Sequence, residues 1–388
     1  MQAEIAFVVD ALAGTGGAEK VLMAALEVFP GTPVYAVVYN PGPFTQSAIA
    51  HSPITTSFIN RLPLSRRHYR SYLPLMPLAV EGFDLSRFER VVSFSYAAAH
   101  GVRSTPGQIH LSYTHTPMRY AWRSVPLRGT LSRWQWLADG ILRSFRKWDV
   151  KAVSRVDQMG AISHYIAGWI QFAYQRDAAV FYPPVVVDRF QPLHPRGDYF
   201  ITVSRLVAHK RLDLIVEAFT TLKLPLVVVG EGPELAHLRK IAGPNITFAG
   251  YQDDAAVASL LGRARAFVYA SEEDFGIAIV EAQAAGCPVI AYGRGGAAET
   301  VCEGTTGVLF REQSASSLLD AIEKFERQAR SFDEGEMVKN ARRFNKERFK
   351  EEFLAFVYQN EPLAHLDQVS LPVRLGEKHS ITGQSLPG

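Results

Sequence analysis

Short apolar runs alternate with segments of helical periodicity along most of this chain. The runs are rich in Val, Ile and Phe and carry few charges, which is typical of strands buried on both faces of a parallel sheet. Regular alternation of such strands with amphipathic helices predicts doubly wound parallel sheets. We expect strands within residues 4–12, 33–39, 54–59, 90–95, 108–113, 199–206, 224–232, 245–250, 265–271, 288–292 and 306–310.

The strands fall into two series, and a length of 388 residues predicts two α/β domains of the Rossmann-like kind that face each other. Pro183 and Pro184, with the polar residues 193–198, are typical of a linker between them. We therefore expect a first domain over residues 1–190 and a second over residues 191–338. The expected helices cover residues 18–29, 130–148, 164–174, 212–222, 233–242, 255–263, 277–285, 297–301, 314–330 and 340–359, and the polar residues 361–388 predict a tail.

Composition limits the class of protein. Hydrophobic residues make up 47% and charged residues 20% of the chain, which is ordinary for a soluble globular protein. Cys287 and Cys302 are its only cysteines, which excludes a disulfide framework and a cysteine-rich metal site. The N-terminus lacks the basic start of a signal peptide, and no apolar run is long enough to span a membrane. These features predict a cytoplasmic protein.

Charge is distributed unevenly. Residues 1–183 hold 18 Lys and Arg against 11 Asp and Glu, whereas residues 184–388 hold 23 against 27. The basic excess gathers in residues 61–70 and 119–155, and such a face suits an anionic membrane surface. The helix expected over residues 130–148 fits both an amphipathic helix packed on its domain and an interfacial helix. Peripheral association with the inner face of a membrane is therefore a hypothesis, and no nucleic-acid partner is expected.

Two carboxylates lie eight positions apart after the strand expected within residues 265–271. Glu273 lies in the turn, Glu281 lies in the first turns of the next helix, and Gly276 lies between them. This turn is at the carboxyl end of a strand, where α/β folds bind ligands, and N–H groups at a helix start suit an oxygen-rich ligand. Solvated glutamates on a surface helix are the alternative. The alanine-rich helix and the strand that follows at once favour a ligand site.

Three further segments carry candidate chemistry. Arg205 and Lys210 straddle a strand end and a helix start, where two cations and helix N–H groups would hold a diphosphate; a solvated basic turn is the alternative. Residues 14–17 form a glycine-rich turn after the first strand, although they match neither a dinucleotide-binding fingerprint nor a P-loop. His115 ends another strand on the ligand side, just before Pro117.

These segments, in this order, resemble the retaining, group 1 glycosyltransferases of the two-domain GT-B fold. Residues 273–281 are similar to the Glu-x7-Glu signature of that family, residues 205–210 to its Arg-x4-Lys, and residues 16–19 to its Gly-Gly-Ala-Glu segment. Residues 113–122 resemble the Tyr-x-His-x-Pro-x-Arg-x-x-Trp motif of bacterial mannosyltransferase-like members. The resemblance covers about residues 1–358.

The resemblance implies catalytic roles for four residues. It places Glu273 against the donor sugar and His115 beside the sugar that is transferred. Arg205 and Lys210 would clamp the donor phosphates and stabilise the departing nucleotide diphosphate.

It also implies a donor-binding set. The backbone of Gly16 and Gly17 would approach the diphosphate across the cleft, and Glu281 would face the nucleotide ribose. Tyr251 is the contact expected on the base side, and Gly230 ends a strand whose backbone can approach the nucleotide. The remaining donor contacts expected are Asp274, Phe275, Gly276 and Ile277.

The reaction implied is hexose transfer with retention, in which the leaving phosphate is the base for the acceptor hydroxyl. The His115 motif favours GDP-mannose, while other UDP- and GDP-linked sugars stay open. The acceptor expected is a glycan or a lipid-linked oligosaccharide in cell-surface polysaccharide biosynthesis. No cofactor and no metal are expected, because Asp253 and Asp254 are better interpreted as a helix start than as a metal motif.

The GT-B resemblance further implies that the helix over residues 339–360 crosses back to the first domain. Two alternatives are a non-catalytic GT-B scaffold that binds nucleotide sugars and a sugar-nucleotide 2-epimerase of the same fold.

Overall fold

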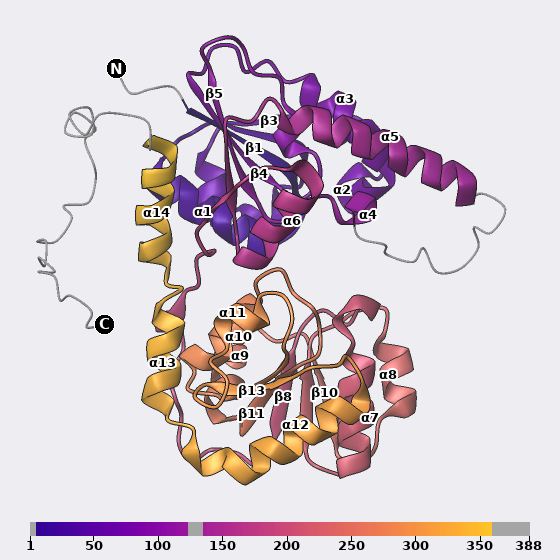
Figure 1. The fold of residues 1–388 in the computed structure, drawn as a ribbon, viewed down its shortest axis with the longest axis vertical. Helices are drawn as coiled ribbons and strands as arrows, with labels where there is room; N and C mark the ends of the chain where they lie inside the picture. Colours follow the sequence, from indigo (N-terminus) through magenta and orange to yellow (C-terminus); the bar gives the residue numbers. More distant parts are fainter. Residues whose placement is uncertain (1–4, 123–134, 359–388) are drawn as a thin grey trace, which may run out of the picture.

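The structure is a computed structural model that describes residues 5–122 and 135–358. Two α/β domains are stacked end to end, and each is built on one sheet of parallel strands (Figure 1). The strand order is β3-β2-β1-β4-β5-β6-β7 in the first domain and β10-β9-β8-β11-β12-β13 in the second. In both sheets the direction of winding reverses beside the first strand, and open α/β sheets bind ligands in the crevice at such a point. The expected pair of facing doubly wound domains is confirmed.

The first domain buries its sheet on both faces, and every residue of β1 is buried. Its strands are β1 Ile5–Leu12, β2 Val34–Tyr39, β3 Ile54–Thr56, β4 Arg90–Ser95, β5 Ile109–Thr114, β6 Gln158–Ala161 and β7 Ala179–Val180. Its helices are α1 Gly17–Val28, α2 Ser65–His68, α3 Met76–Glu81, α4 Arg119–Trp122, α5 Gln135–Val153 and α6 His164–Tyr174.

The second domain repeats this arrangement with six strands. They are β8 Phe200–Val203, β9 Leu226–Val229, β10 Ile246–Gly250, β11 Ala266–Tyr269, β12 Val289–Tyr292 and β13 Gly307–Phe310. Its helices are α7 Leu212–Leu222, α8 Leu235–Ile241, α9 Asp254–Arg263, α10 Ile277–Ala284, α11 Ala297–Thr300, α12 Ala315–Gln328 and α13 Glu334–Arg342, and the chain then continues into α14 Lys346–Tyr358, which belongs to the first domain.

Several elements of the first domain differ from expectation: β6, β7, α2, α3 and α4 were not expected, and two further elements have other bounds. The strand expected over residues 54–59 ends at Thr56, because the Ser57 hydroxyl accepts the Ile59 N–H and starts a 3-10 turn. Helix α5 runs from 135 to 153, and the start of the expected helix lies outside the described residues. Phe145 of this helix is buried and Trp148 donates to Glu81 at 2.9 Å, as in an amphipathic helix packed on its domain.

The single helix expected over residues 340–359 is wrong, because two helices, α13 and α14, replace it. The Asn345 side chain accepts the Arg348 N–H at 2.8 Å and caps the start of α14. Just before it, the Phe344 carbonyl accepts the Val185 N–H at 2.9 Å. The chain therefore passes between the domains twice, side by side, at Val185 and at Phe344.

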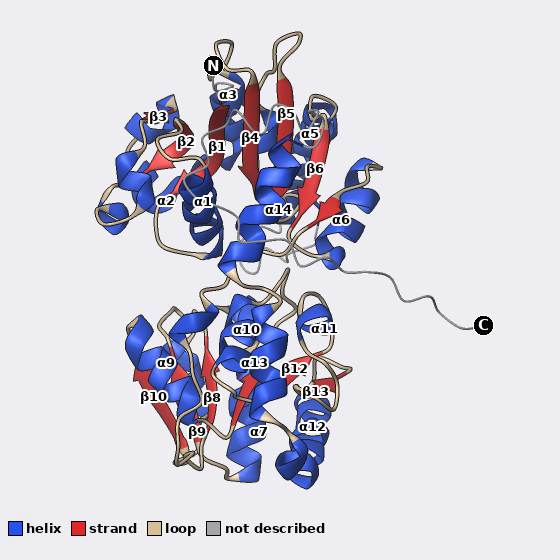
Figure 2. Cartoon of the chain, turned by 90° about the vertical axis from the view of Figure 1, so that its left-hand side faces the viewer, coloured by secondary structure: helices blue, strands red, loops and turns tan. Residues whose placement is uncertain are grey.

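Helix α14 packs on the first domain, whereas α13 packs on α10 of the second (Figure 2). Phe349 and Phe353 of α14 are fully buried. The Phe353 ring lies 6.1 Å from that of Phe7 and 5.7 Å from that of Phe94, centroid to centroid. Because α14 fills the core of the first domain, residues from both ends of the chain stabilise that domain together.

Candidate active site between the two sheets

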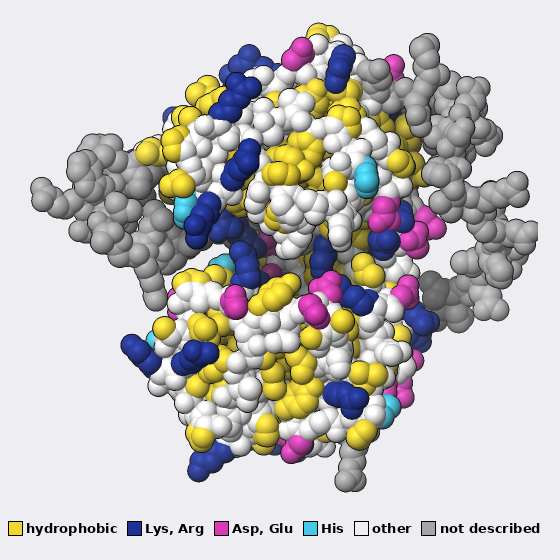
Figure 3. Space-filling view, turned by 180° about the vertical axis from the view of Figure 1, so that it is seen from behind, with side chains coloured by type: hydrophobic (Ala, Val, Ile, Leu, Met, Phe, Trp, Pro, Cys, Tyr) yellow, Lys and Arg dark blue, Asp and Glu magenta, His cyan; other side chains and the backbone are white. Residues whose placement is uncertain are grey.

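The carboxyl ends of the two sheets face each other across a groove. Gly17 begins α1 after β1, and Ile277 begins α10 after β11. A Cβ added to Gly17 would lie 3.0 Å from the Ile277 side chain, so the starts of these helices nearly touch. Lys and Arg side chains lie along the rim of the groove (Figure 3). The expected glycine turn and the Glu-x7-Glu helix are thus brought together.

The centre of the site is an ion pair between the two loops of the second domain. The Lys210 ammonium lies 2.5 Å from a Glu273 carboxylate oxygen and 2.8 Å from the Tyr269 hydroxyl. The Ser271 hydroxyl donates to the same carboxylate oxygen at 3.0 Å. Lys210 ends a 3-10 turn, Ala208–Lys210, and Arg211 then adopts a left-handed conformation at φ 52° before α7. This turn points the lysine at the end of β11.

Electrostatics keep Glu273 ionised. Burial alone would raise the pKa of this carboxyl. The nearby charges of Lys210 and Arg119, with the Ser271 hydrogen bond, outweigh burial and hold the pKa of Glu273 below its usual value. The Glu273 carboxylate and the Lys210 ammonium therefore lie together at one side of the groove, and their side chains are only 16% and 14% exposed.

Close backbone approach shapes the Glu273 turn. Gly276, the N-cap residue of α10, has φ +89°, in the left-handed region that favours glycine. The following loop lies directly on the turn, since the Gly296 N–H donates to the Glu273 carbonyl at 2.7 Å. A Cβ added to Gly296 would lie 2.1 Å from the Phe275 carbonyl oxygen. The turn and the loop therefore form one unit.

Arg205 lies in the loop after β8 and is exposed. Its guanidinium makes no ion pair or hydrogen bond with residues 5–122 or 135–358. Gly230, at φ +127°, packs so close to this loop that an added Cβ would lie 1.9 Å from the Ser204 carbonyl oxygen. Gly230 thus supports the loop that carries Arg205, and its contact with a nucleotide stays a prediction.

Across the groove, the side chain of Glu19 accepts hydrogen bonds from N–H groups at the start of its own helix, α1. The Glu19 carboxyl, which is mostly buried, accepts hydrogen bonds from the backbone of Glu19 and Gly16. Burial raises the pKa of Glu19, while these bonds and the charge of Arg205 oppose that rise. Arg205 of the second domain thus acts electrostatically on the start of α1 in the first domain.

Glu281 does not point into solvent. One of its carboxylate oxygens lies 3.3 Å from the Lys20 ammonium of α1 and 3.1 Å from the Arg189 guanidinium of the linker. Arg189 also pairs with Asp254 of α9. The sequence analysis did not predict roles for Lys20 and Arg189. Lys20 could have been found, because it directly follows the Gly-Gly-Ala-Glu segment. The contact of Glu281 with a ribose stays a prediction.

His115 directly follows β5 and is buried, with 8% of its surface exposed. Its ring packs edge-on against Tyr113, with 5.5 Å between centroids. Its Nε2 atom has no hydrogen-bond partner among the described residues. Burial lowers the pKa of His115 to about 4, so the imidazole is neutral at neutral pH. Depending on the tautomer, Nε2 of the neutral ring can donate or accept one hydrogen bond. The place of His115 beside a sugar stays a prediction.

Phe275 and Tyr251, two of the expected donor contacts, differ from the others in their exposure. The Phe275 ring is buried against Tyr182 and Phe344, with centroids 5.6 and 5.4 Å away, so any donor contact at this position falls to its backbone. Tyr251 follows β10 and is 74% exposed. Its contact with a base stays a prediction.

Side chains near the site also join the two domains. Arg119 of α4 pairs with Asp274, whose carbonyl accepts the Ser163 hydroxyl at 2.6 Å. The Glu299 carboxylate accepts the N–H groups of His164 and Tyr165 at 2.9 and 2.8 Å, and so caps α6 from the other domain. Sequence reasoning assigned no role to Arg119 or Glu299, although Arg119 occupies the arginine of the His115 motif.

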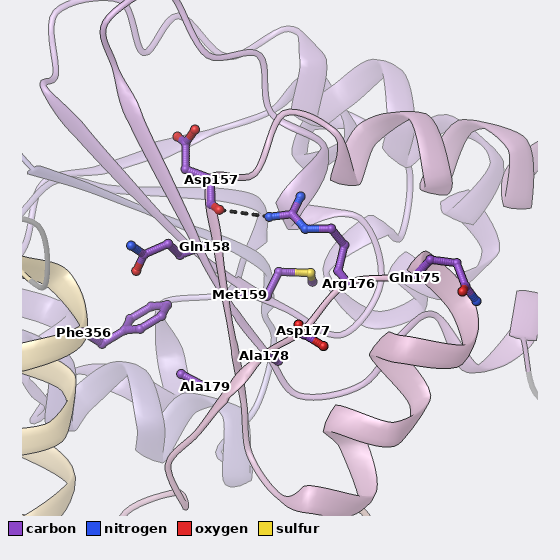
Figure 4. Close-up of a pocket in the computed structure, with 9 residues that line it drawn as sticks. All are labelled: Asp157, Gln158, Met159, Gln175, Arg176, Asp177, Ala178, Ala179 and Phe356. Carbon is purple, nitrogen blue, oxygen red and sulfur yellow. Dashed lines mark hydrogen bonds between the residues drawn. The ribbon is translucent and has the colours of Figure 1, made fainter.

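Other features of the surface do not enlarge this site. A cavity of about 560 Å³ lies at the amino ends of β6 and β7, the opposite end of the sheet, and Arg176 there donates to the Asp157 carbonyl (Figure 4).

Within residues 5–122 and 135–358, no three His, Cys, Asp or Glu side chains gather as a metal site would require. No helix described is long and apolar enough to cross a membrane.

Sequence comparison finds a family model and several relatives that match mainly the second domain. Residues 187–347 match the family model described as Glycosyl transferases group 1. A GDP-mannose-dependent alpha-(1-6)-phosphatidylinositol monomannoside mannosyltransferase of Mycobacterium tuberculosis is 32% identical over 199 residues, covering 43% of this chain and 51% of the relative. A glycogen synthase of Xanthomonas campestris is 29% identical over 186 residues, covering 46% and 37%. The chain thus spans about half or less of these relatives.

Solved structures match the whole fold. Sucrose-phosphate synthase from Thermosynechococcus elongatus superposes with a TM-score of 0.71 at 18% identity, covering 92% of this chain and 98% of that chain. The lipopolysaccharide outer core galactosyltransferase WaaB superposes with a TM-score of 0.65 at 18% identity, covering 92% and 99%. This chain therefore has the two-domain GT-B fold of glycosyltransferases, with a second domain that matches the group 1 family model over residues 187–347.

Proposed function

We propose that this protein is a retaining hexosyltransferase that moves a sugar from a nucleotide sugar to a hydroxyl of a glycan or a lipid-linked acceptor. The observation that carries the proposal is the Lys210–Glu273 ion pair beside Arg205, at the facing ends of two parallel sheets. A nucleotide diphosphate needs cations, and a sugar needs carboxylate acceptors for its hydroxyls; both lie at the same edge here.

In the proposed step, the bond between the anomeric carbon and the diphosphate oxygen breaks, and its electron pair stays on the leaving diphosphate. The acceptor hydroxyl oxygen bonds to the anomeric carbon on the same face, and its proton passes to a diphosphate oxygen. Arg205 and Lys210 would stabilise the charge that develops on that diphosphate. Glu273 would hold the sugar, and neutral His115 would bond one of its hydroxyls.

GDP-mannose is the donor we propose. It is supported by the His115 motif and by the partial match to a mannosyltransferase whose name specifies GDP-mannose. Glu281 would accept the ribose hydroxyls once the donor displaces Lys20 or shares the carboxylate with it. The reaction proposed needs no metal, because Arg205 and Lys210 supply the positive charge that a bound divalent cation supplies elsewhere.

A donor panel tests the proposal. The panel consists of GDP-mannose, GDP-fucose, UDP-glucose and UDP-GlcNAc. We expect GDP-mannose to give the highest rate of nucleotide diphosphate release. Addition of EDTA should leave that rate unchanged. Turnover restored by Mg²⁺ after EDTA abolishes it would contradict the metal-independent step. Donor turnover that yields free nucleotide and an epimerised sugar without any acceptor would point to the 2-epimerase instead.

We further propose that the first domain associates with anionic membranes through α5. Arg143, Lys147 and Lys151 are exposed on this helix, beside Ile141 and Val150, which are 51% and 45% exposed. Val150 lies on the same side of the helix as Arg143, Lys147 and Lys151, and basic and apolar side chains on one exposed surface suit a headgroup region.

We expect the protein to float with vesicles rich in anionic lipid at low salt. Because each basic residue near such a surface contributes about 1 kcal/mol, replacing Arg143, Lys147 and Lys151 by Glu should abolish flotation. The matched control combines Lys223→Glu, Lys240→Glu and Arg263→Glu, which reverses three exposed charges on the second domain. Flotation that is equal for the two variants would exclude α5 as the contact.

A further inference from the structure

Arg119 reaches from the first domain into the candidate site of the second. It is the first residue of α4, and its guanidinium pairs with Asp274, the neighbour of Glu273. One third of its side chain stays exposed, whereas the Asp274 side chain is 11% exposed. Asp274 occupies only part of a group that carries five N–H donors, so the guanidinium can bind a second anion.

The element that carries Arg119 is held firmly. Met118 and Ala121 are buried, with 1% and 0% exposed. The Trp122 indole donates to Asp149 at 2.6 Å, and the Arg146 guanidinium donates to the Ala121 carbonyl. A short helix fixed at both ends presents its first side chain to the groove in a defined place, which is what precise binding of a charged group requires.

Three cations converge on one spot from two domains. The charges of Lys210, Arg119 and Arg205 all act on the His209 side chain, and those of Arg119 and Arg205 both act on Tyr269. Glu273 pairs with Lys210 and Asp274 pairs with Arg119. Arg205 has no such carboxylate among the described residues. The charge of Arg205 also acts on the Glu19 carboxyl, but Arg205 is the cation of this cluster that forms no ion pair among the described residues, so its guanidinium is available to a polyanion.

We propose that Arg119 is a third cation of the donor diphosphate site, supplied by the first domain, and that it binds the leaving diphosphate in the closed enzyme. This inference rests on the proposed transfer from a nucleotide sugar. Asp274 holds the guanidinium in the groove until the donor arrives, and the exposed N–H groups then bind phosphate oxygens. The first domain would thereby contribute to leaving-group stabilisation as well as to acceptor binding.

A purely structural alternative is that the Arg119–Asp274 pair only holds the domains together. Several other contacts already do so near the site. Ser163 donates to the Asp274 carbonyl, and Glu299 caps α6. Lys20 and Glu281 pair as well. An ion pair that only holds the domains together would work equally well with its two charges exchanged. A guanidinium that binds the diphosphate would not, because the exchange puts a carboxylate in its place.

The experiment compares Arg119→Ala, Arg119→Lys and the exchange Arg119→Asp with Asp274→Arg. We expect Arg119→Ala to lower kcat about 100-fold, the size expected for loss of one charge-stabilising donor. Arg119→Lys should restore part of the rate, and the exchange should restore none. Arg103→Ala is the matched control, since it removes a surface arginine of the same domain that pairs with Glu81. Thermal unfolding checks that each variant is folded.

Binding of GDP and UDP, measured by calorimetry, provides a second readout that needs no acceptor. Arg119→Ala should weaken binding of the better nucleotide about tenfold or more. Wild-type kcat and binding in Arg119→Ala, or an exchange variant that regains the wild-type rate, would overturn the inference while the proposed function stands. Wild type that neither binds GDP or UDP nor turns over any donor would overturn the proposed function, and this inference with it.

Discussion

Replacing Lys210 by alanine should lower kcat about 100- to 1000-fold, with a smaller change in the donor KM. The ammonium is the cation closest to Glu273, at 2.5 Å, and in the proposed reaction it stabilises charge that appears on the diphosphate as the glycosidic bond breaks. An interaction that is strongest in the transition state lowers kcat when it is lost. Initial rates at several donor concentrations would measure both constants.

The same substitution should also destabilise the fold, which has to be separated from its effect on catalysis. Glu273 would lose its closest partner in a site where its side chain is 16% exposed, and an uncompensated buried charge costs on the order of 3–5 kcal/mol. The double variant Lys210→Ala with Glu273→Gln removes both charges. We expect its free energy of unfolding to recover towards wild type while kcat stays low.

A surface ion pair of equal length provides the control. Lys324 lies 2.5 Å from Glu303, but these side chains are 43% and 42% exposed. Such pairs contribute about 0–1 kcal/mol, so Lys324→Ala should leave both stability and kcat near wild type. If the double variant at Lys210 and Glu273 recovers kcat together with stability, the pair is structural and the proposed function loses its main support.

The parts of this site that are local in sequence were predictable. The strand that ends at Tyr269, the glycine at 276 and the helix that begins at Ile277 each carry their own signal within a few residues. The expected bounds of α6 and α7 also agree with the structure, because an apolar periodicity defines each helix from end to end.

Contacts between distant segments were not predictable. Arg119 and Asp274 are 155 positions apart, and Lys20 and Glu281 are 261 apart. No local pattern records such a pairing, since it depends on how two domains are stacked. Phe275 is instructive in the same way: its position in the motif indicated a donor contact, but packing against Tyr182 and Phe344 buries its ring.

The break between α13 and α14 interrupts an apolar periodicity that indicated one helix. Phenylalanines at helical spacing from 344 to 356 indicated one continuous helix. Asn345 is a preferred residue for a helix start, and it caps α14 in the structure. Because the hydrogen bond from Val185 to the Phe344 carbonyl joins the two crossings of the chain, the break is fixed by a contact that the periodicity does not contain.

Gly296→Ala should abolish most of the activity and destabilise the second domain by about 3 kcal/mol or more. The added Cβ would lie 2.1 to 2.3 Å from the carbonyl oxygen, Cα and carbonyl carbon of Phe275, and backbone atoms in a packed turn have little room to move. The φ of Gly296 is −62°, which any residue adopts, so the whole effect would come from close approach. Chemical denaturation and donor turnover would measure the two losses.

Gly168→Ala is the matched control, because Gly168 lies inside α6 and an added Cβ there meets no atom within 4 Å. Alanine favours a helix over glycine, so this variant should be as stable as wild type or more stable, by up to about 1 kcal/mol. Full activity in Gly296→Ala would mean that the loop can leave the turn without moving Glu273. The expected loss instead follows from the hydrogen bond between the Gly296 N–H and the Glu273 carbonyl, since the contact that excludes a Cβ also fixes the backbone of the carboxylate proposed to hold the donor sugar.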